Sequence, residues 1–358
     1  VTATSYAGDG SGLTGVAGTE NIRTNTNATF LQNINVGVAI TAGKLGIGFT
    51  DANVKVGNTA LDSLTTGNYN TAVGHQSLTA NTTGSNNTSV GNESLDANTT
   101  GASNTAIGAA ALGVNSTGDN NVAVGALALD ANTTASANTA VGRASLSANT
   151  TGANNTAVGY NSLVSNTTAS NNTAVGTDAL SVNTTGTKNT AVGQGSLDAN
   201  TTGDHNVAIG NDALGANTTS QKNVAVGDRA LAANTDQGNN TAVGFQALQT
   251  NSGGYRNTAI GYISLQQNTS GHDLVAIGEQ AMYSNTTGQD SVAVGRNAMG
   301  SNTTGDFNTA VGAYALDANT TAHNNTALGY NSLSANVSGI QCTAVGANAL
   351  DANTTASN

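Results

Sequence analysis

The chain has 358 residues, of which only 8% are charged and 3% are aromatic, and it contains no proline and no tryptophan. A compact globule of this length needs large apolar side chains to fill its core, so the composition favours a long, thin molecule whose interior is narrow throughout. The net charge of −11 is spread along the chain and the nine Lys and Arg residues form no cluster, which argues against a nucleic-acid-binding surface.

Residues 1–50 do not follow the repeat that fills the rest of the chain. The stretch from Gly8 to Gly18 is rich in glycine, which predicts turns. Residues 28–49 alternate apolar and polar side chains, which indicates a few short strands. We therefore expect residues 1–50 to form a cap or neck, because an uncovered first coil of a solenoid would expose a sheet edge.

From residue 51 to residue 358 the sequence follows a strict 17-residue repeat without an insertion or a deletion. One glycine recurs in every repeat, and its place is called position 0 below. The eighteen glycines that define the period are Gly57, Gly74, Gly91, Gly108, Gly125, Gly142, Gly159, Gly176, Gly193, Gly210, Gly227, Gly244, Gly261, Gly278, Gly295, Gly312, Gly329 and Gly346. A strict period of this kind is typical of a solenoid, and helical repeats are excluded because a pair of helices needs roughly 33 residues or more.

Each repeat carries the same residue types at fixed distances from its glycine. With few exceptions, Asn stands at position −4, Thr or Val at −3, Ala at −2 and Val or Ile at −1. Ala or Ser follows at +3, Leu at +4 and Asn at +7, where it usually opens the sequence Asn-Thr-Thr-Gly. The β-branched stretch predicts a short strand, the Ala/Ser-Leu pair a second extended segment, and Asn-Thr-Thr-Gly a turn. Two short strands and two turns would complete one coil.

We therefore predict an all-β fold, a parallel β-solenoid or β-roll of eighteen 17-residue coils over residues 51–358. Stacking would place residues of adjacent repeats directly above one another, about 4.8 Å apart. Identical residues would then form ladders, apolar for Val and Leu and amide-bonded for Asn. The handedness of the coil stays open. Representative structural ladder residues are Val73, Gly74, Leu78, Asn81, Val158, Gly159, Leu163 and Asn166.

The strand before each glycine has two faces, and the face that points inward decides the assembly. A small coil favours Ala inside, and Val and Ile would then form an outward stripe along the whole solenoid. Such a stripe is untenable on a soluble monomer, and three copies around one axis would cover it. The opposite arrangement, with Val and Leu inside and Ala outside, would give a monomeric solenoid. We expect the first arrangement and a homotrimer.

Two known groups of proteins have similar repeats. The steps at residues 122–125 and 207–210 resemble the head repeats of trimeric autotransporter adhesins, which form left-handed parallel β-rolls but have a shorter repeat. The full unit, Asn-Thr-Ala-Val-Gly-x-x-Ala/Ser-Leu-x-x-Asn-Thr-Thr-Gly, more closely resembles repeats of bacteriophage tail-fibre proteins. Residues 6–15 also resemble a segment common in such fibres. The resemblance covers essentially the whole chain and implies a trimeric fibre from which a C-terminal chaperone domain is removed after assembly.

These observations lead to two functional hypotheses. The first is the shaft of a phage tail fibre, located in the virion, which joins other fibre or tail proteins at both ends and holds a host-recognition tip at a distance. The second is a bacterial surface adhesin or an extracellular filament subunit, similar to trimeric autotransporters, whose flank binds a cell-surface glycan or receptor directly. An ice-binding solenoid is a weaker hypothesis, because that surface requires Thr-x-Thr on a strand face and the paired Thr residues here are adjacent in a turn.

We expect no enzymatic activity and no catalytic, cofactor-binding or metal-ligating residues. The carboxylates occur singly, and the Gly-rich segments follow the repeat instead of forming a phosphate-binding loop. His75, His205, His272 and His323 are expected to be surface turn residues, and Cys342 to be a buried, unreactive thiol. No apolar run is long enough for a membrane span, so no membrane insertion is expected.

Positions +1 and +2 vary freely between repeats, which makes them the place for surface recognition. Aromatic side chains there could contact a glycan through their ring faces. The candidate residues are Tyr160, Phe245, Tyr262, Tyr314 and Tyr330.

Overall fold

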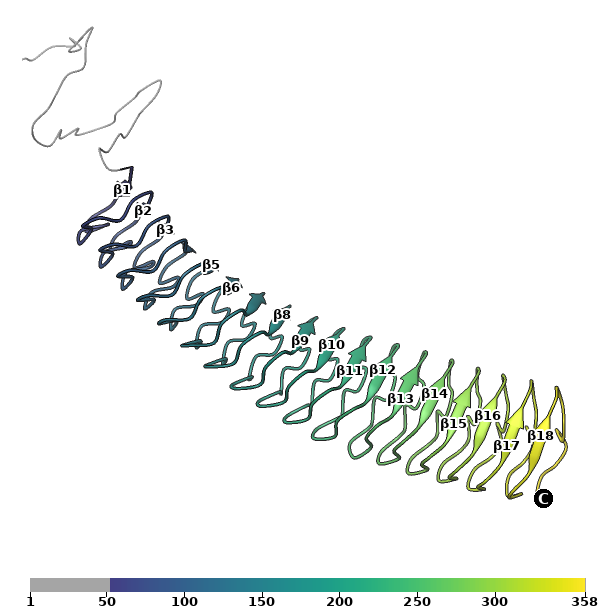
Figure 1. Cartoon of the computed structure of the whole chain (residues 1–358). Helices are drawn as coiled ribbons and strands as arrows, with labels where there is room; N and C mark the ends of the chain where they lie inside the picture. Colours follow the sequence, from purple (N-terminus) through teal and green to yellow (C-terminus); the bar gives the residue numbers. More distant parts are fainter. Residues whose placement is uncertain (1–51, 358) are drawn as a thin grey trace, which may run out of the picture. The chain divides into compact units, whose positions relative to one another are not determined.

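The computed structural model describes residues 52–357, so the cap expected at residues 1–50 lies outside the described residues. The described chain winds into a β-solenoid with one three-residue strand in each coil (Figure 1). The strands are β1 (Val54–Val56), β2 (Thr71–Val73), β3 (Thr88–Val90), β4 (Thr105–Ile107), β5 (Val122–Val124), β6 (Thr139–Val141), β7 (Thr156–Val158), β8 (Thr173–Val175), β9 (Thr190–Val192), β10 (Val207–Ile209), β11 (Val224–Val226), β12 (Thr241–Val243), β13 (Thr258–Ile260), β14 (Val275–Ile277), β15 (Val292–Val294), β16 (Thr309–Val311), β17 (Thr326–Leu328) and β18 (Thr343–Val345).

Each strand pairs in parallel with the strand of the next coil, from β1 with β2 to β17 with β18. The register is the one that the repeat predicts, since Thr156 lies beside Thr173 and Val158 beside Val175. The strands together form one 18-stranded sheet. The prediction of an all-β parallel solenoid with 17-residue coils is therefore confirmed.

The second predicted strand of each coil does not form in residues 52–357, so that part of the prediction was wrong. The segment that carries the Ala/Ser-Leu pair is a chain of turns. In the coil of Gly159, Asn161 has a φ of 53° and Leu163 a φ of 51°, and positions +2 and +4 take this left-handed conformation in every coil. Left-handed backbone costs an L-residue roughly 1–2 kcal/mol, so the segment needs a compensating interaction.

Hydrogen bonds between coils provide that compensation. The N–H of Leu163 donates to the carbonyl of Ala179 in the next coil at 3.0 Å, and the N–H of Asn161 donates to the carbonyl of Arg143 in the preceding coil at 3.2 Å. Residues of positive φ at positions +2 and +4 are separated by one residue without it, and the amides donate along the solenoid axis as they would in a strand. The turn segment therefore stacks in the same register as the sheet without being one.

The glycine at position 0 is fixed by the close approach of neighbouring coils. Gly159 has a φ of 138°, and a Cβ atom there would lie 2.4 Å from the carbonyl oxygen of Gly176 in the next coil. Gly74 has a φ of 139°, and a Cβ there would lie 2.2 Å from the carbonyl oxygen of Gly91. Any side chain at this position would therefore force two coils apart.

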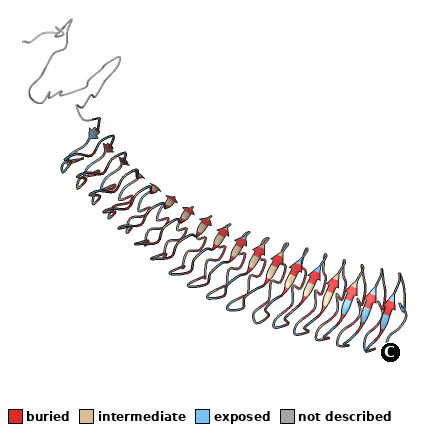
Figure 2. Ribbon diagram, viewed as in Figure 1, coloured by how far each residue is buried: buried red, intermediate tan, exposed pale blue. Residues whose placement is uncertain are grey.

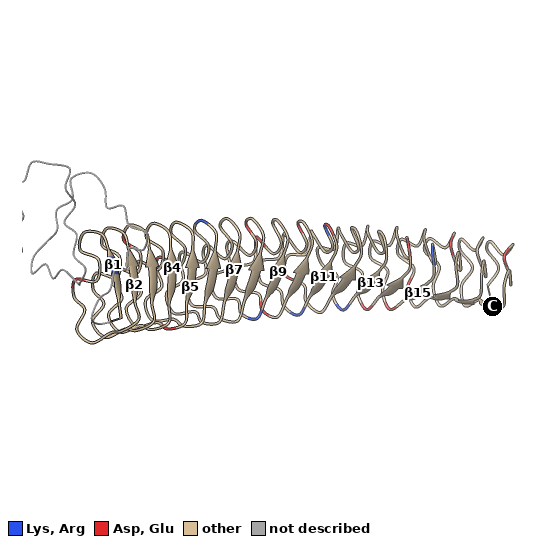
Figure 3. Cartoon of the chain, turned by 90° about the horizontal axis from the view of Figure 1, so that it is seen from above, with Lys and Arg blue, Asp and Glu red and all other residues tan. Residues whose placement is uncertain are grey.

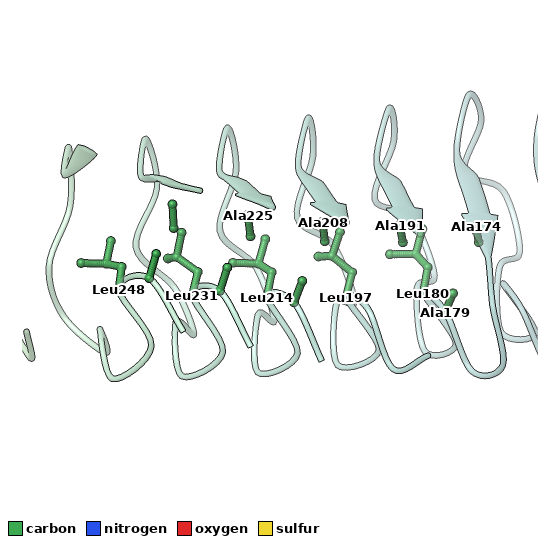
Figure 4. Packing of buried hydrophobic residues seen from close by; sticks show 14 of the residues in the cluster. Ala174, Ala179, Leu180, Ala191, Leu197, Ala208, Leu214, Ala225, Leu231 and Leu248 are labelled. Atoms are coloured by element: carbon green, nitrogen blue, oxygen red, sulfur yellow. The ribbon is translucent and has the colours of Figure 1, made fainter. Parts of the chain in front are cut away.

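The interior of the solenoid is a column of Ala and Leu side chains that continues from coil to coil (Figure 4). Ala157 at position −2 and Leu163 at position +4 are both fully buried, whereas Val158 at position −1 is only half-buried. Figure 2 shows the same contrast between buried and partly exposed residues along the strands. The orientation with Ala inward and Val outward is thus the observed one, and the alternative with Val inside and Ala outside is wrong.

Candidate functional site

Two columns of asparagine stand inside the coils. The −4 column consists of the residues at position −4, and the +7 column of those at position +7. Asn155 and Asn166 of one coil both donate from Nδ2 to the carbonyl of Ala169, at 2.8 and 3.0 Å. That carbonyl, at position +10, therefore takes hydrogen bonds from both columns at once. The columns are structural, because every one of these buried amides is used to close the coil.

Along the solenoid axis the two columns bond in different ways. In the +7 column, Asn166 donates from Nδ2 to Oδ1 of Asn149 in the preceding coil at 2.9 Å. In the −4 column, Oδ1 of Asn155 instead accepts the backbone N–H of Asn172 in the next coil at 2.9 Å. The representative residues Asn81 and Asn166 both lie in the +7 column, where Nδ2 of Asn98 donates to Oδ1 of Asn81 at 2.9 Å.

The outer face of the sheet carries a continuous apolar stripe, defined here as the outer stripe and made of the side chains at position −1. Val73 and Val158 belong to it and are half-buried. The larger side chains stand further out, with 40% of Ile107 and 47% of Leu328 exposed. The stripe continues through every coil from β1 to β18, and Thr or Val at position −3 runs beside it. Contiguous exposed apolar surface is a common feature of protein interaction sites.

The structure brings four of the five candidate aromatic residues together in two separate pairs. Phe245 and Tyr262 stack with ring centroids 5.6 Å apart, and Tyr314 meets Tyr330 edge-on at 6.2 Å. Tyr160 belongs to neither pair and lies 5.8 Å from the guanidinium of Arg143. The five residues therefore do not make one recognition surface.

A further polar and aromatic cluster, at positions +11 and +12, was not singled out from the sequence. Tyr255 stacks on His272 at 4.6 Å, and Arg256 forms an ion pair with Asp273 at 2.8 Å. Nδ1 of His272 also lies 2.9 Å from the Asp273 carboxylate. The available signal was the repeat itself, because residues one repeat apart with complementary chemistry are neighbours in adjacent coils.

Apart from this cluster, the charged groups of the described coils are mostly spread along the solenoid (Figure 3). No group of three or more His, Cys, Asp or Glu residues that could hold a metal ion occurs within residues 52–357. Figure 3 shows the charged residues scattered along the coils. Cys342 is a buried member of the −4 column, where its N–H donates to Oδ1 of Asn325 at 2.9 Å.

Four aspartates at position +5 differ from the other carboxylates. Burial raises the pKa of each of them above the usual value, and a neighbouring carboxylate raises the pKa further for two of them, Glu93 for Asp96 and Asp212 for Asp198. The four residues are Asp96, Asp130, Asp198 and Asp317. They lie on the turn segment of their coils, so this segment contains partly buried acceptor groups.

The chain matches no protein-family model and no curated protein. Within the part of the chain that the structure describes, no helix could cross a bilayer. The structure shows a β-solenoid repeat protein with a buried interior of Ala, Leu and Asn and an outward stripe of Val and Ile.

Proposed function

We propose that the solenoid is the shaft of a bacteriophage tail fibre, built from three copies of the chain and located in the virion. Other fibre or tail proteins would join it at both ends, and a host-recognition tip would be carried at its far end. The role is mechanical. Eighteen coils at about 4.8 Å per coil give a rod on the order of 85 Å long.

The outer stripe is the observation that carries this proposal. Val and Ile side chains remain partly exposed in coil after coil, although the solenoid has its own complete core of Ala and Leu. A monomer would leave the whole stripe in water, and burial of apolar surface stabilises association by about 25 cal/mol per Å² before the costs of association. The stripe therefore favours a permanent partner.

The spacing of the stripe favours another copy of the same chain as that partner. Apolar side chains recur once per coil, so a partner with a different repeat would drift out of register within a few coils. A second copy has the same spacing and can match the stripe over its whole length. Cyclic symmetry then closes the assembly, and three copies around one axis bury all three stripes.

A surface adhesin or filament with the same assembly is the second candidate, and one observation favours it. The stacked pair of Phe245 and Tyr262 lies on the flank of the solenoid with 43% and 52% of these residues exposed, which suits direct contact with a receptor. Ice binding has less support, because the outer face of the described strands carries Thr-x-Val, Val-x-Val and similar pairs and no Thr-x-Thr pair.

The molar mass in solution, measured by light scattering behind a sizing column, tests the assembly. We expect three times the chain mass of 35.0 kDa. The double variant Val124→Lys with Val192→Lys places charges on the outer stripe and is expected to give monomers with an unchanged circular dichroism spectrum. The control, Ala126→Lys with Gln194→Lys, changes the same two coils at position +1 and is expected to stay trimeric.

Two results would contradict the proposal. One is a wild-type mass of 35.0 kDa at all concentrations, since the outer stripe would then be uncovered in solution. The other is dissociation of the control together with the stripe variant, because charge at any surface position would then be enough to separate the chains.

A further inference from the structure

A notch interrupts the turn segment of three consecutive coils, those of Gly278, Gly295 and Gly312. Its volume is about 300 Å³. At position +5 these coils carry Tyr283, Gly300 and Asp317 in turn. The residues that line the notch are Gln280, Tyr283, Ser284, Asn297, Gly300, Ser301 and Asp317. Because Gly300 has no side chain, a gap remains between Tyr283 in the preceding coil and Asp317 in the next.

The fold does not require glycine at position 300. The φ of Gly300 is not in the left-handed region, and the nearest atom to an added Cβ is Oδ1 of Asp317 at 2.8 Å, the end of a mobile side chain. Other coils place Gln249 and Gln266 at the same position, and Nε2 of Gln266 donates to Oε1 of Gln249 at 3.1 Å. Glycine here therefore leaves space that the repeat would otherwise fill.

The lining of the notch is rich in hydrogen-bond acceptors. Oδ1 of Asn297 is buried and has no hydrogen-bond partner among the described residues, so rotation of this amide toward a ligand would break no existing bond of that oxygen. Asp317 adds a partly buried carboxylate, and burial raises the pKa of that group. No Lys or Arg lines the notch, so nothing there attracts an anion. The groups suit a neutral ligand with several donating hydroxyls.

Tyr283 adds a different kind of contact. Its half-buried ring gives the notch an aromatic wall beside the polar groups. Sugar rings match this combination, because they have a C–H face that packs on an aromatic ring and hydroxyls around the edge. A divalent cation does not match it, since Ca²⁺ takes about six to eight oxygen ligands and the lining offers a single carboxylate.

We propose that this notch binds one neutral monosaccharide unit of a glycan. Gln280, Asn297 and Asp317 would contact the hydroxyls, and Tyr283 the ring face. The notch consists of residues at positions +2, +5 and +6, and none of them belongs to the outer stripe. The binding site therefore goes beyond the structural role and does not depend on the number of chains in the fibre.

A printed array of defined glycans tests the site, with neutral hexose, N-acetylhexosamine and sialic acid termini among its members. Wild-type protein is expected to bind glycans with neutral termini. Gly300→Gln fills the notch with a side chain that position +5 accepts in other coils, and it is expected to lower this binding at least about tenfold. Gly113→Gln is the matched control, since an added Cβ at Gly113 has no contact closer than 3.5 Å.

The same circular dichroism spectrum for all three proteins would show that both variants are folded, so that a difference in binding reports on the notch. Loss of binding in Gly300→Gln together with retention in Gly113→Gln supports the site. Equal binding by wild type and Gly300→Gln overturns it, and so does the absence of wild-type binding to every neutral glycan on the array. Binding restricted to sialylated glycans would overturn the assignment to a neutral sugar.

Discussion

The −4 column and the +7 column both consist mainly of asparagine inside the same coils, yet asparagine is replaced more often in the −4 column. The −4 column contains Leu274, Ser291 and Cys342 in place of Asn, whereas the only replacement in the +7 column is Leu64, in the first coil. Burial does not explain the difference, because Asn155 and Asn166 are both fully buried. The two columns differ in what each side chain must supply to its neighbours.

In the −4 column a backbone N–H donates the axial hydrogen bond from each coil to the side chain of the preceding one, as Asn172 does to Asn155. Leu274 and Cys342 still donate their N–H groups to the asparagine of the preceding coil, at 3.1 and 2.9 Å. Ser291 keeps the acceptor as well, since its Oγ accepts the N–H of Asn308 at 3.0 Å. A substitution therefore interrupts the column at one coil at most.

In the +7 column both halves of each axial bond come from side chains. Every member between the two ends must accept from the coil on one side and donate to the coil on the other, and only a side-chain amide offers both groups in this geometry. Leu64 is tolerated because the column begins after it, with Asn81, whose Nδ2 donates to the carbonyl of Gly84 at 3.0 Å. Identical residues at equivalent depth can thus be under unequal constraint.

Among substitutions in the two columns, Asn166→Leu is expected to lower the stability of the solenoid most. It removes the bonds to Asn149, Ala169 and Asn183. It leaves Oδ1 of Asn149 without a donor and one N–H of the Asn183 amide without an acceptor. We expect the free energy of unfolding to fall by about 2–4 kcal/mol, measured by chemical denaturation. A loss smaller than that of the next variant would show that the +7 column is not the more constrained one.

Asn155→Leu gives a coil in the middle of the solenoid the residue that Leu274 provides at position −4 of its own coil. It leaves the N–H of Asn172 without its acceptor, while the carbonyl of Ala169 keeps its bond from Asn166. We expect a loss of about 1–3 kcal/mol in the same denaturation experiment. Hydrogen exchange at the Asn172 amide should rise in this variant, and unchanged protection there would contradict the assigned bond.

Ser291→Asn is expected to have the smallest effect, in the stabilising direction. The asparagine would keep an acceptor for Asn308 and add a donor for the carbonyl of Gly305, as its equivalents do in other coils. The new bond replaces the one that Oγ of Ser291 donates to the carbonyl of Gln289 at 3.0 Å, so a gain of about 1 kcal/mol or less should follow from the more deeply buried contact. A loss of stability would mean that this coil has adjusted to the smaller side chain.

The 17-residue period was sufficient to predict the fold class and the register, because one spacing repeated through every coil leaves a single way to stack. The period did not decide the inward orientation of Ala, which was expected because a small coil favours small side chains in its interior. It was not sufficient to predict the turn segment. Leu163 in an Ala/Ser-Leu pair suggested an extended strand, but the residue adopts a φ of 51° because hydrogen bonds to adjacent coils stabilise the left-handed backbone. Local propensity does not contain that contribution.

The candidate sites were harder to predict than the fold. The pairing of Phe245 with Tyr262 follows from the period, since these residues are one repeat apart, and so does the separation of Tyr160, which lies five repeats before Phe245. The edge-on contact of Tyr314 with Tyr330 needs the coil geometry, because these residues stand at positions +2 and +1 of adjacent coils. The notch depends on what a glycine at position 300 leaves empty between Tyr283 and Asp317. A sequence read one residue at a time gives little weight to a missing side chain.

Each described strand contacts only the strands of the adjacent coils. The protein can therefore gain or lose whole repeats during evolution, because the coils on either side of the change have the same geometry and can stack on one another. Unequal recombination between repeats would change the number of coils and therefore the length of the solenoid, while its cross-section stays the same. A deletion that misses the length of the repeat by a single residue would instead leave one coil of the wrong length, whose strand could not both pair in register and keep its Ala inward.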